Sequence, residues 1–221
     1  MELGMKETMA ARAARELEKG NIVNLGIGIP TLVADFIDPG LNIVLHSENG
    51  FLGIGPSPKK GDEDPDLVNA GGLPVTVTDI VSYFDSLTSF AIVRGGKLDV
   101  TVLGALEVSG RGDLANWIVP GRIVPGMGGG MDLALKARRT IVLMTHVNKD
   151  GEPKIKASCT LPLTAERCVD LIITDRAVIE VTPDGLLLRE VSRNSSVPEV
   201  IASTGAPLAL SREIGILEER I

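Results

Sequence analysis

The stretch NIVNLGIGIPTLVADFIDPGLNIVLHSENG, residues 21–50, decides the predicted fold. An apolar strand over residues 21–25 leads into Gly26-Ile27-Gly28-Ile29-Pro30, and a short helix over 31–36 begins just after that proline. A second apolar strand, over 41–46, comes next. A strand, a helix and a strand in this order form a β-α-β unit, which predicts parallel strands and a right-handed crossover.

The rest of the chain extends this pattern. We expect an amphipathic helix over residues 5–19, closed by Gly20, and a tight turn at Pro183-Asp184-Gly185 that joins an antiparallel hairpin. Further strands are predicted at 75–78, 98–103, 140–145, 171–174, 178–181 and 186–191, and further helices near 85–93 and 131–138. The sequence therefore predicts one α/β domain over residues 1–221, with an open, mostly parallel sheet, flanking helices and a terminal β-hairpin.

Composition excludes several classes of protein. Apolar residues make up 44% of the 221 residues but aromatic residues only 3%, so the core must be aliphatic. The net charge is −7 and no Lys/Arg run exceeds two residues, which argues against a nucleic-acid partner. No apolar run is long enough for a membrane span, and the N-terminal segment is charged, so we expect a cytoplasmic protein. Cys159 and Cys168 have no nearby ligand residues and are expected to be small core residues, without metal or disulfide.

Glu48 is the residue whose placement most favours a chemical role. It is the one charged side chain between Asp38 and Lys59, and a buried strand delivers it to the turn Ser47-Glu48-Asn49-Gly50. Desolvation raises the pKa of such a carboxylate and makes its ionised form more reactive as a nucleophile. The alternative is that Glu48 points outward at a loop tip. His46 could orient Glu48, but its alternation with Ser47 favours an ordinary core position on the other face of the sheet.

Two glycine-rich loops accompany this turn. The first, at residues 24–30, lets the backbone approach a ligand, but it lacks the third glycine of a dinucleotide site and is equally compatible with a tight strand-to-helix turn. The second, Gly126-Met127-Gly128-Gly129-Gly130-Met131-Asp132, follows a strand predicted near 122–124. Four glycines in five residues free backbone N–H groups for an oxyanion hole, although a flexible surface loop has the same composition.

Together these segments resemble the β subunits of the two-subunit family I coenzyme A transferases, of the 3-oxoacid and acetate/butyrate–acetoacetate type. The resemblance rests on VNLGIGIPTLVADFI (23–37), HSENGFLGIGPSP (46–58), DLVNAGG (66–72), SFAIVRGGKLDVTVLGALEV (89–108), GDLANWIVPG (112–121), GMGGGMDL (126–133) and CTLPLT (159–164). It implies CoA transfer between a short-chain acyl-CoA or 3-oxoacyl-CoA and a carboxylate acceptor. The cycle would be ping-pong, through a glutamyl-CoA thioester, with CoA as a substrate and no metal or other cofactor.

The resemblance also assigns roles. It implies that Glu48 is the catalytic nucleophile, and that backbone groups of Gly129 and Gly128 form the oxyanion hole. The CoA-binding residues would be Asn24, Gly26, Gly28 and Asn49.

Further contacts are expected from Lys59 and Lys60, which are candidates for the CoA phosphates, and from a partner α subunit. That partner would form a heterodimer or a dimer of heterodimers, with the active site between subunits. Many relatives that use 3-oxoacids have a lysine where this chain has Gly72, so this position is closer to the acetate/butyrate–acetoacetate branch. Two alternatives stay open: a non-catalytic sugar-phosphate-binding or regulatory module, and an acyl-CoA hydrolase.

Overall fold

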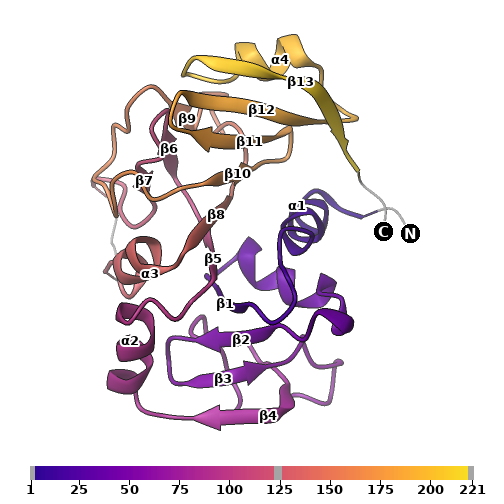
Figure 1. The fold of residues 1–221 in the computed structure, drawn as a ribbon, viewed down its shortest axis with the longest axis vertical. Coiled ribbons are helices and arrows are strands. Elements are labelled where there is room, and N and C mark those ends of the chain that lie inside the picture. The colour runs from indigo at the N-terminus through magenta and orange to yellow at the C-terminus, as the bar shows by residue number, and fades with distance from the viewer. Residues whose placement is uncertain (1–2, 122–125, 219–221) are drawn as a thin grey trace.

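The computed structural model describes residues 3–121 and 126–218, and its centre is a ten-stranded sheet (Figure 1). The strand order is β13-β12-β11-β10-β8-β5-β1-β2-β3-β4. Five of the nine strand pairs in this sheet are parallel, which confirms the mostly parallel α/β fold. The parallel centre contains β2 (Val44–Ser47), β1 (Ile22–Leu25), β5 (Val100–Gly104), β8 (Arg139–Leu143) and β10 (Leu171–Ile173).

Antiparallel strand pairs flank this centre on both sides. On one side lie β3 (Phe51–Ile54) and β4 (Val77–Tyr83), and on the other lie β11 (Ala177–Thr182), β12 (Gly185–Ser192) and β13 (Leu208–Leu217), of which β13 is parallel to β12. Apart from this sheet, the described residues form a small one with the order β7-β6-β9, made of β6 (Glu107–Ser109), β7 (Leu114–Ala115) and β9 (Ile155–Lys156).

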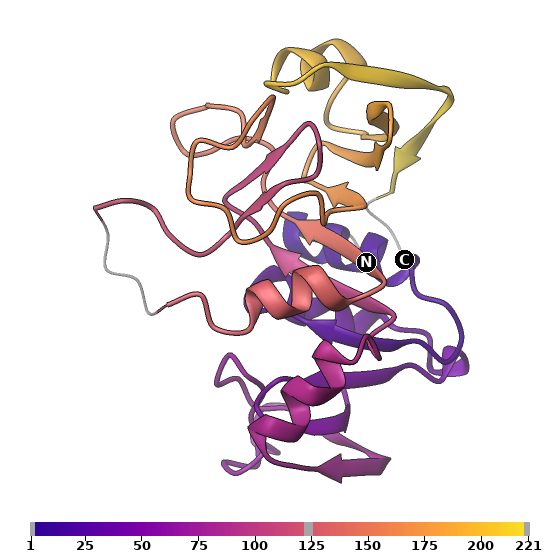
Figure 2. The same ribbon diagram turned by 60° about the vertical axis from the view of Figure 1, so that its left-hand side comes forward.

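Helices cover both faces of the large sheet and give two apolar cores. One face carries α1 (Met5–Ala14) and the 3₁₀ helix η1 (Ile29–Phe36), and the other carries α2 (Ser86–Arg94) and α3 (Gly130–Lys136) (Figures 1 and 2). The short 3₁₀ helix η2 (Pro39–Leu41), which has no buried residue, comes between η1 and β2. The aliphatic core expected from composition is confirmed, since Phe51 is the one aromatic residue among the buried core residues described.

The parallel centre places the ends of β1, β2 and β5 side by side. In this register Asn24 of β1 pairs with His46 of β2 and with Thr101 of β5. The loops that follow these strands therefore meet at one edge of the sheet, which is where open α/β sheets bind ligands.

Several predicted elements differ from the structure. The first helix ends at Ala14 rather than Lys19. The chain turns after Ala14, so that Leu17 stays buried and the Gly20 N–H donates to the carbonyl of Leu41, at 2.8 Å. The strand predicted at 75–78 begins two residues later and runs to Tyr83, as β4. The hairpin of β11 and β12 is confirmed but is not terminal, since α4 (Val197–Ala202) and β13 follow it. The strand predicted near 122–124 lies outside the described residues. Within the described ranges, no helix has the length and apolar character that crossing a membrane requires.

Candidate active site

A tight turn at the end of β2 presents Glu48. The N–H of Gly50 donates to the carbonyl of Ser47, at 3.0 Å, so Glu48 and Asn49 occupy the two central positions of the turn. Gly50 has a φ of 128°, and a side chain there would collide with the carbonyl oxygen of Phe84. The Gly50 carbonyl also accepts a bond from the N–H of Phe84, at 2.9 Å. The glycine is therefore required by both the backbone conformation and the close approach of the next chain segment.

The neighbours of Glu48 are tied to a third segment of the chain, residues 68–70. The N–H of Ala70 donates to the hydroxyl of Ser47, at 3.1 Å, and the side-chain amide of Asn49 donates to the carbonyl of Val68, at 2.8 Å. These two bonds hold the turn from both sides of Glu48. Its carboxylate is left directed to the glycine loop.

The carboxylate of Glu48 lies against Gly129. The Gly129 N–H donates a hydrogen bond to it, and a Cβ built on Gly129 would collide with the Glu48 oxygen Oε2 and approach two carbons of the Phe90 ring to 2.9 Å. Burial raises the pKa of Glu48 above its ordinary value, and the bond from Gly129 lowers it by less. The carboxyl group is thus half-buried and in contact with the glycine loop, not an exposed loop tip.

A cavity of about 530 Å³ opens beside this pair. Among the described residues that line it, Glu48 alone carries an ionisable side chain. The walls come from the ends of β1 and β5 and from the glycine loop, and they include Asn24, Leu25, Gly26, Ile27, Ala70, Leu103, Gly104, Ala105, Leu106, Asn116, Trp117, Met127, Gly128, Gly129 and Leu133. Such a cavity is largely apolar and offers backbone groups, so it can strip water from the reacting carboxylate.

A buried polar chain lies under this cavity. Asn24 is 2% exposed, and its side-chain amide donates to the carbonyl of His46 at 3.2 Å and lies 3.1 Å from His46 Nδ1, while His46 Nε2 lies 3.0 Å from the Ser89 hydroxyl. Burial lowers the pKa of His46 to about 4, so the ring is neutral at neutral pH. Nδ1 then accepts from Asn24, and Nε2–H donates to Ser89. The predicted core position of His46 is confirmed.

Comparison with known proteins decides the family. The family description "Coenzyme A transferase" matches residues 6–203. Over 205 residues the chain is 53% identical to the β subunit of a probable coenzyme A transferase of Bacillus subtilis, an alignment that covers 93% of this chain and 94% of the relative. This chain belongs to the coenzyme A transferase family. Both the predicted family and the predicted class of enzyme, a transferase, are thereby confirmed.

Other relatives include one that the chain matches over almost its whole length and a longer one that it matches only in part. The B subunit of a probable succinyl-CoA:3-ketoacid coenzyme A transferase of Bacillus subtilis is 49% identical over 209 residues, which are 95% of this chain and 97% of the relative. Human mitochondrial succinyl-CoA:3-ketoacid coenzyme A transferase 2 is 48% identical over 210 residues, but this chain covers only 41% of its length.

Solved structures share the fold. An acyl-CoA transferase from Escherichia coli O157:H7 superposes with a TM-score of 0.77 at 23% identity, over 99% of this chain and 44% of that chain. Glutaconate coenzyme A-transferase from Acidaminococcus fermentans superposes with a TM-score of 0.71 at 17% identity, over 99% of this chain and 90% of that chain.

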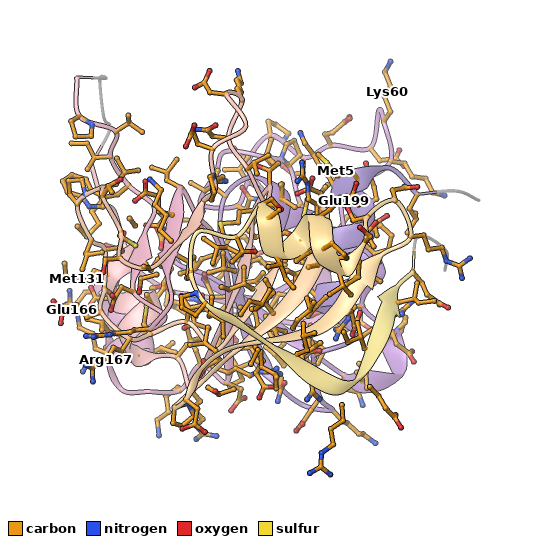
Figure 3. The ribbon with its side chains drawn as sticks, turned by 90° about the horizontal axis from the view of Figure 1, so that it is seen from above. Met5, Lys60, Met131, Glu166, Arg167 and Glu199 are labelled. Carbon is orange, nitrogen blue, oxygen red and sulfur yellow. The ribbon has the colours of Figure 1, made fainter. Side chains whose placement is uncertain are left out.

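The structure brings together some of the residues expected to act in this coenzyme A transferase and not others. Glu48, Asn24, Gly26, Gly128 and Gly129 all line the cavity. The remaining residues predicted to contact CoA do not line the cavity. Gly28, with a φ of 93°, directly precedes η1, and Asn49 is exposed and bonded to Val68. Lys59 and Lys60 are exposed, and Lys60 extends away from the body of the chain (Figure 3).

The cysteines match the expectation only in part. Cys159 and Cys168 are both free thiols, and they are partly exposed rather than the fully buried core residues expected from the sequence. Burial of the sulfur raises the pKa of each thiol to about 12, so they are unreactive at neutral pH. Among the described residues no cluster of His, Cys, Asp or Glu could hold a metal ion.

Sequence reasoning missed Asn116 and Trp117, which line the cavity together with Glu48. Asn116 Oδ1 accepts from the Thr164 hydroxyl at 2.6 Å, its amide donates to the carbonyl of Gly104 at 3.1 Å, and Trp117 Nε1 donates to the carbonyl of Leu163 at 3.3 Å. The bonds to Thr164 and Leu163 join the segment at 112–121 to the segment at 159–164. Both segments carry the family resemblance, which was the one signal that could have identified the two residues.

Proposed function

We propose that this chain is the subunit that carries the catalytic glutamate of a two-subunit CoA transferase. The enzyme moves CoA between a short-chain acyl-CoA or 3-oxoacyl-CoA and a carboxylate acceptor, through a glutamyl-CoA thioester. One observation carries the proposal: the half-buried carboxylate of Glu48 accepts a hydrogen bond from the backbone N–H of Gly129 beside a largely apolar cavity.

The first step forms an anhydride. The Glu48 carboxylate attacks the thioester carbonyl carbon, the C–S bond breaks, and CoA leaves as a thiolate. That thiolate attacks the carbonyl carbon of Glu48, the bond to the acyl oxygen breaks, and the donor acid leaves as a carboxylate. An acceptor carboxylate then takes CoA from Glu48 by the same two steps in reverse order.

The N–H of Gly129 supports both halves of this cycle. In each half, attack on the carbonyl carbon of Glu48 passes through a tetrahedral centre whose oxygen becomes negatively charged, and the Gly129 N–H beside that oxygen stabilises the charge. Loss of one such donor costs roughly 100- to 1,000-fold in rate. The half-buried carboxylate is only partly hydrated, so it begins closer to its reactive state than a carboxylate in water.

A partner subunit completes the site in this proposal. Within the described part of the chain no lysine or arginine lines the cavity, although CoA is polyanionic. Relatives of similar length are named as the B or β subunits of their enzymes, which supports a separate partner chain. We assign the phosphate contacts of CoA mainly to that partner, in a heterodimer or a dimer of heterodimers.

Trapping the thioester tests the proposal. The complex with its partner subunit is incubated with acyl-CoA, treated with borohydride and digested, and the peptide that contains Glu48 is weighed by mass spectrometry. We expect reduction at Glu48 together with loss of activity. Glu48→Gln should be inactive and unlabelled, whereas Glu63→Gln, a change at an exposed acid, should behave as wild type. An unlabelled Glu48 with activity retained in Glu48→Ala contradicts the proposal. CoA release without an acceptor would identify a hydrolase instead.

A further inference from the structure

The glycine loop cannot fix its own position. Gly126 and Gly128 have φ values of 113° and 57°, and Gly128, Gly129 and Gly130 have no side chains to pack. Met131 does not anchor the loop either, because its side chain is 43% exposed and lies at the edge of the molecule (Figure 3). A hydrogen-bond donor that must stand at a fixed distance from Glu48 therefore needs support from another element.

Helix α2 supplies a polar contact to the start of α3. Arg94, in the last turn of α2, donates through Nε to Asp132 Oδ1 at 3.0 Å and through Nη2 to Asp132 Oδ2 at 2.9 Å. Asp132 is in the first turn of α3, directly after the glycine loop. The two helices pack side by side (Figure 2). A two-point bond between guanidinium and carboxylate fixes orientation as well as distance.

The same face of α2 also contacts the loop through an aromatic ring. Phe90 lies one helical turn before Arg94, so the two side chains share a face. Two ring carbons of Phe90 stand 2.9 Å from the point that a Cβ of Gly129 would occupy. The guanidinium carbon of Arg94 lies 5.6 Å from the centre of the same ring. The Phe90 ring therefore lies against both Gly129 and the guanidinium of Arg94.

We propose that Arg94, Asp132 and Phe90 are positioning residues that set the distance between the Gly129 N–H and the Glu48 carboxylate. The inference rests on the proposed function, because it assigns these residues to the donor of the oxyanion hole. None of the three lines the cavity, so they would act through Gly129 and not on the substrate.

The test uses four variants in complex with the partner subunit: Arg94→Gln, Asp132→Asn, Phe90→Leu and the exchange Arg94→Asp with Asp132→Arg. A control variant, Arg138→Gln, breaks a similar ion pair away from the cavity. The Arg138–Asp99 pair is 2.8 Å long with side chains 71% and 24% exposed, against 61% and 28% for Arg94–Asp132. The measurements are kcat, KM for acyl-CoA, Tm and the pH dependence of kcat/KM.

We expect each single variant to lower kcat about 10- to 100-fold with little change in KM or Tm. A weaker bond from Gly129 should raise the pKa of Glu48, so the acid limb of the pH profile should move to higher pH. The exchange should recover much of the loss, and Arg138→Gln should match wild type.

Wild-type kcat in Arg94→Gln and Asp132→Asn would overturn the inference. So would a loss of rate that follows Tm, leaves the acid limb unmoved and is not recovered by the exchange. Thioester trapping at Glu48 separates this failure from failure of the proposed function: a labelled Glu48 with unaffected Arg94 variants removes only the positioning role.

Discussion

The backbone N–H of Gly129 donates to the carboxylate of Glu48, and the same Gly129 leaves no room for a side chain between that carboxylate and the ring of Phe90. The contact joins the end of β2 to the start of α3, which are distant in the sequence and neighbours only in the folded chain. It therefore combines the two features that the chemistry requires, a carboxylate with reduced hydration and a rigid hydrogen-bond donor.

Replacement of Gly129 tests this contact most directly. In Gly129→Ala the new methyl group would collide with Glu48 and Phe90, so the loop or the carboxylate must move. We expect kcat to fall by roughly 100-fold or more, as for loss of an oxyanion donor. Gly130→Ala is the matched comparison, since a Cβ there meets nothing closer than 3.8 Å and should cost far less. Equal losses in the two variants would contradict the assigned role of Gly129.

Glu48 should lower the stability of the chain while it serves catalysis. Its pKa is raised in the folded state by burial, so above that pKa the ionised carboxylate costs free energy that the unfolded chain does not pay. Glu48→Gln should therefore raise Tm at pH 7, by about 2–4 °C if the gain is about 1 kcal/mol. This difference in Tm should disappear as the pH falls below the ordinary pKa of a glutamate, because Glu48 is then protonated in both the folded and the unfolded chain. Scanning calorimetry at pH 7 and pH 4 measures it, and a Tm for Glu48→Gln below wild type at pH 7 would contradict this account.

The sequence predicts the parallel centre of the fold well, because β1, β2, β5, β8 and β10 are short apolar runs between turn residues. It fails at β13, whose residues are mostly half-buried or exposed and include Ser211-Arg212-Glu213, so neither alternation nor an apolar run marks the strand. It also fails at β7 and β9, which contain two residues each and exist only through their partners.

The candidate site also contains residues that a local sequence pattern predicts and residues that it does not. Glu48 was predictable because an acid at the end of an apolar strand has a local signature. The contacts of Gly129 with Phe90 and of Asn116 with Thr164 depend on how separate segments pack, and no local pattern reports that. The resemblance implies a CoA contact for Asn49, but adjacent residues in a turn point in different directions, and in the folded chain the Asn49 amide donates to the carbonyl of Val68.

His46 should make stability depend on pH in a way that one substitution removes. Its pKa falls from about 6.5 in the unfolded chain to about 4 in the folded protein, because burial disfavours the charged ring. The stabilisation from the neutral ring is thus complete above pH 6.5 and is lost as the pH falls toward 4. His46→Gln keeps hydrogen-bonding capacity toward Asn24 and Ser89 but does not titrate. We expect the Tm difference between wild type and His46→Gln to shrink between pH 7 and pH 5, and a constant difference would contradict the neutral buried ring.

Asn24 and Thr101 are neighbours in register, and both have a buried oxygen without a hydrogen-bond partner in the described part of the chain, yet they should respond oppositely to apolar replacement. The amide of Asn24 donates to His46, so Asn24→Leu leaves buried acceptors unpaired, at a cost of about 1–3 kcal/mol. The Thr101 hydroxyl has no such bond to lose, and Thr101→Val should leave stability unchanged or raise it. Denaturant unfolding of the two variants measures the difference in stability.

The same two variants also differ in their expected effect on substrate binding. A CoA contact by Asn24 predicts that Asn24→Leu raises KM for acyl-CoA, whereas Thr101→Val should not, because Thr101 does not line the cavity. A similar loss of stability in both variants would contradict this account. It would mean that the Asn24 and Thr101 side chains share a hydrogen-bond network through a buried water molecule, so that His46 alone does not fix the Asn24 amide.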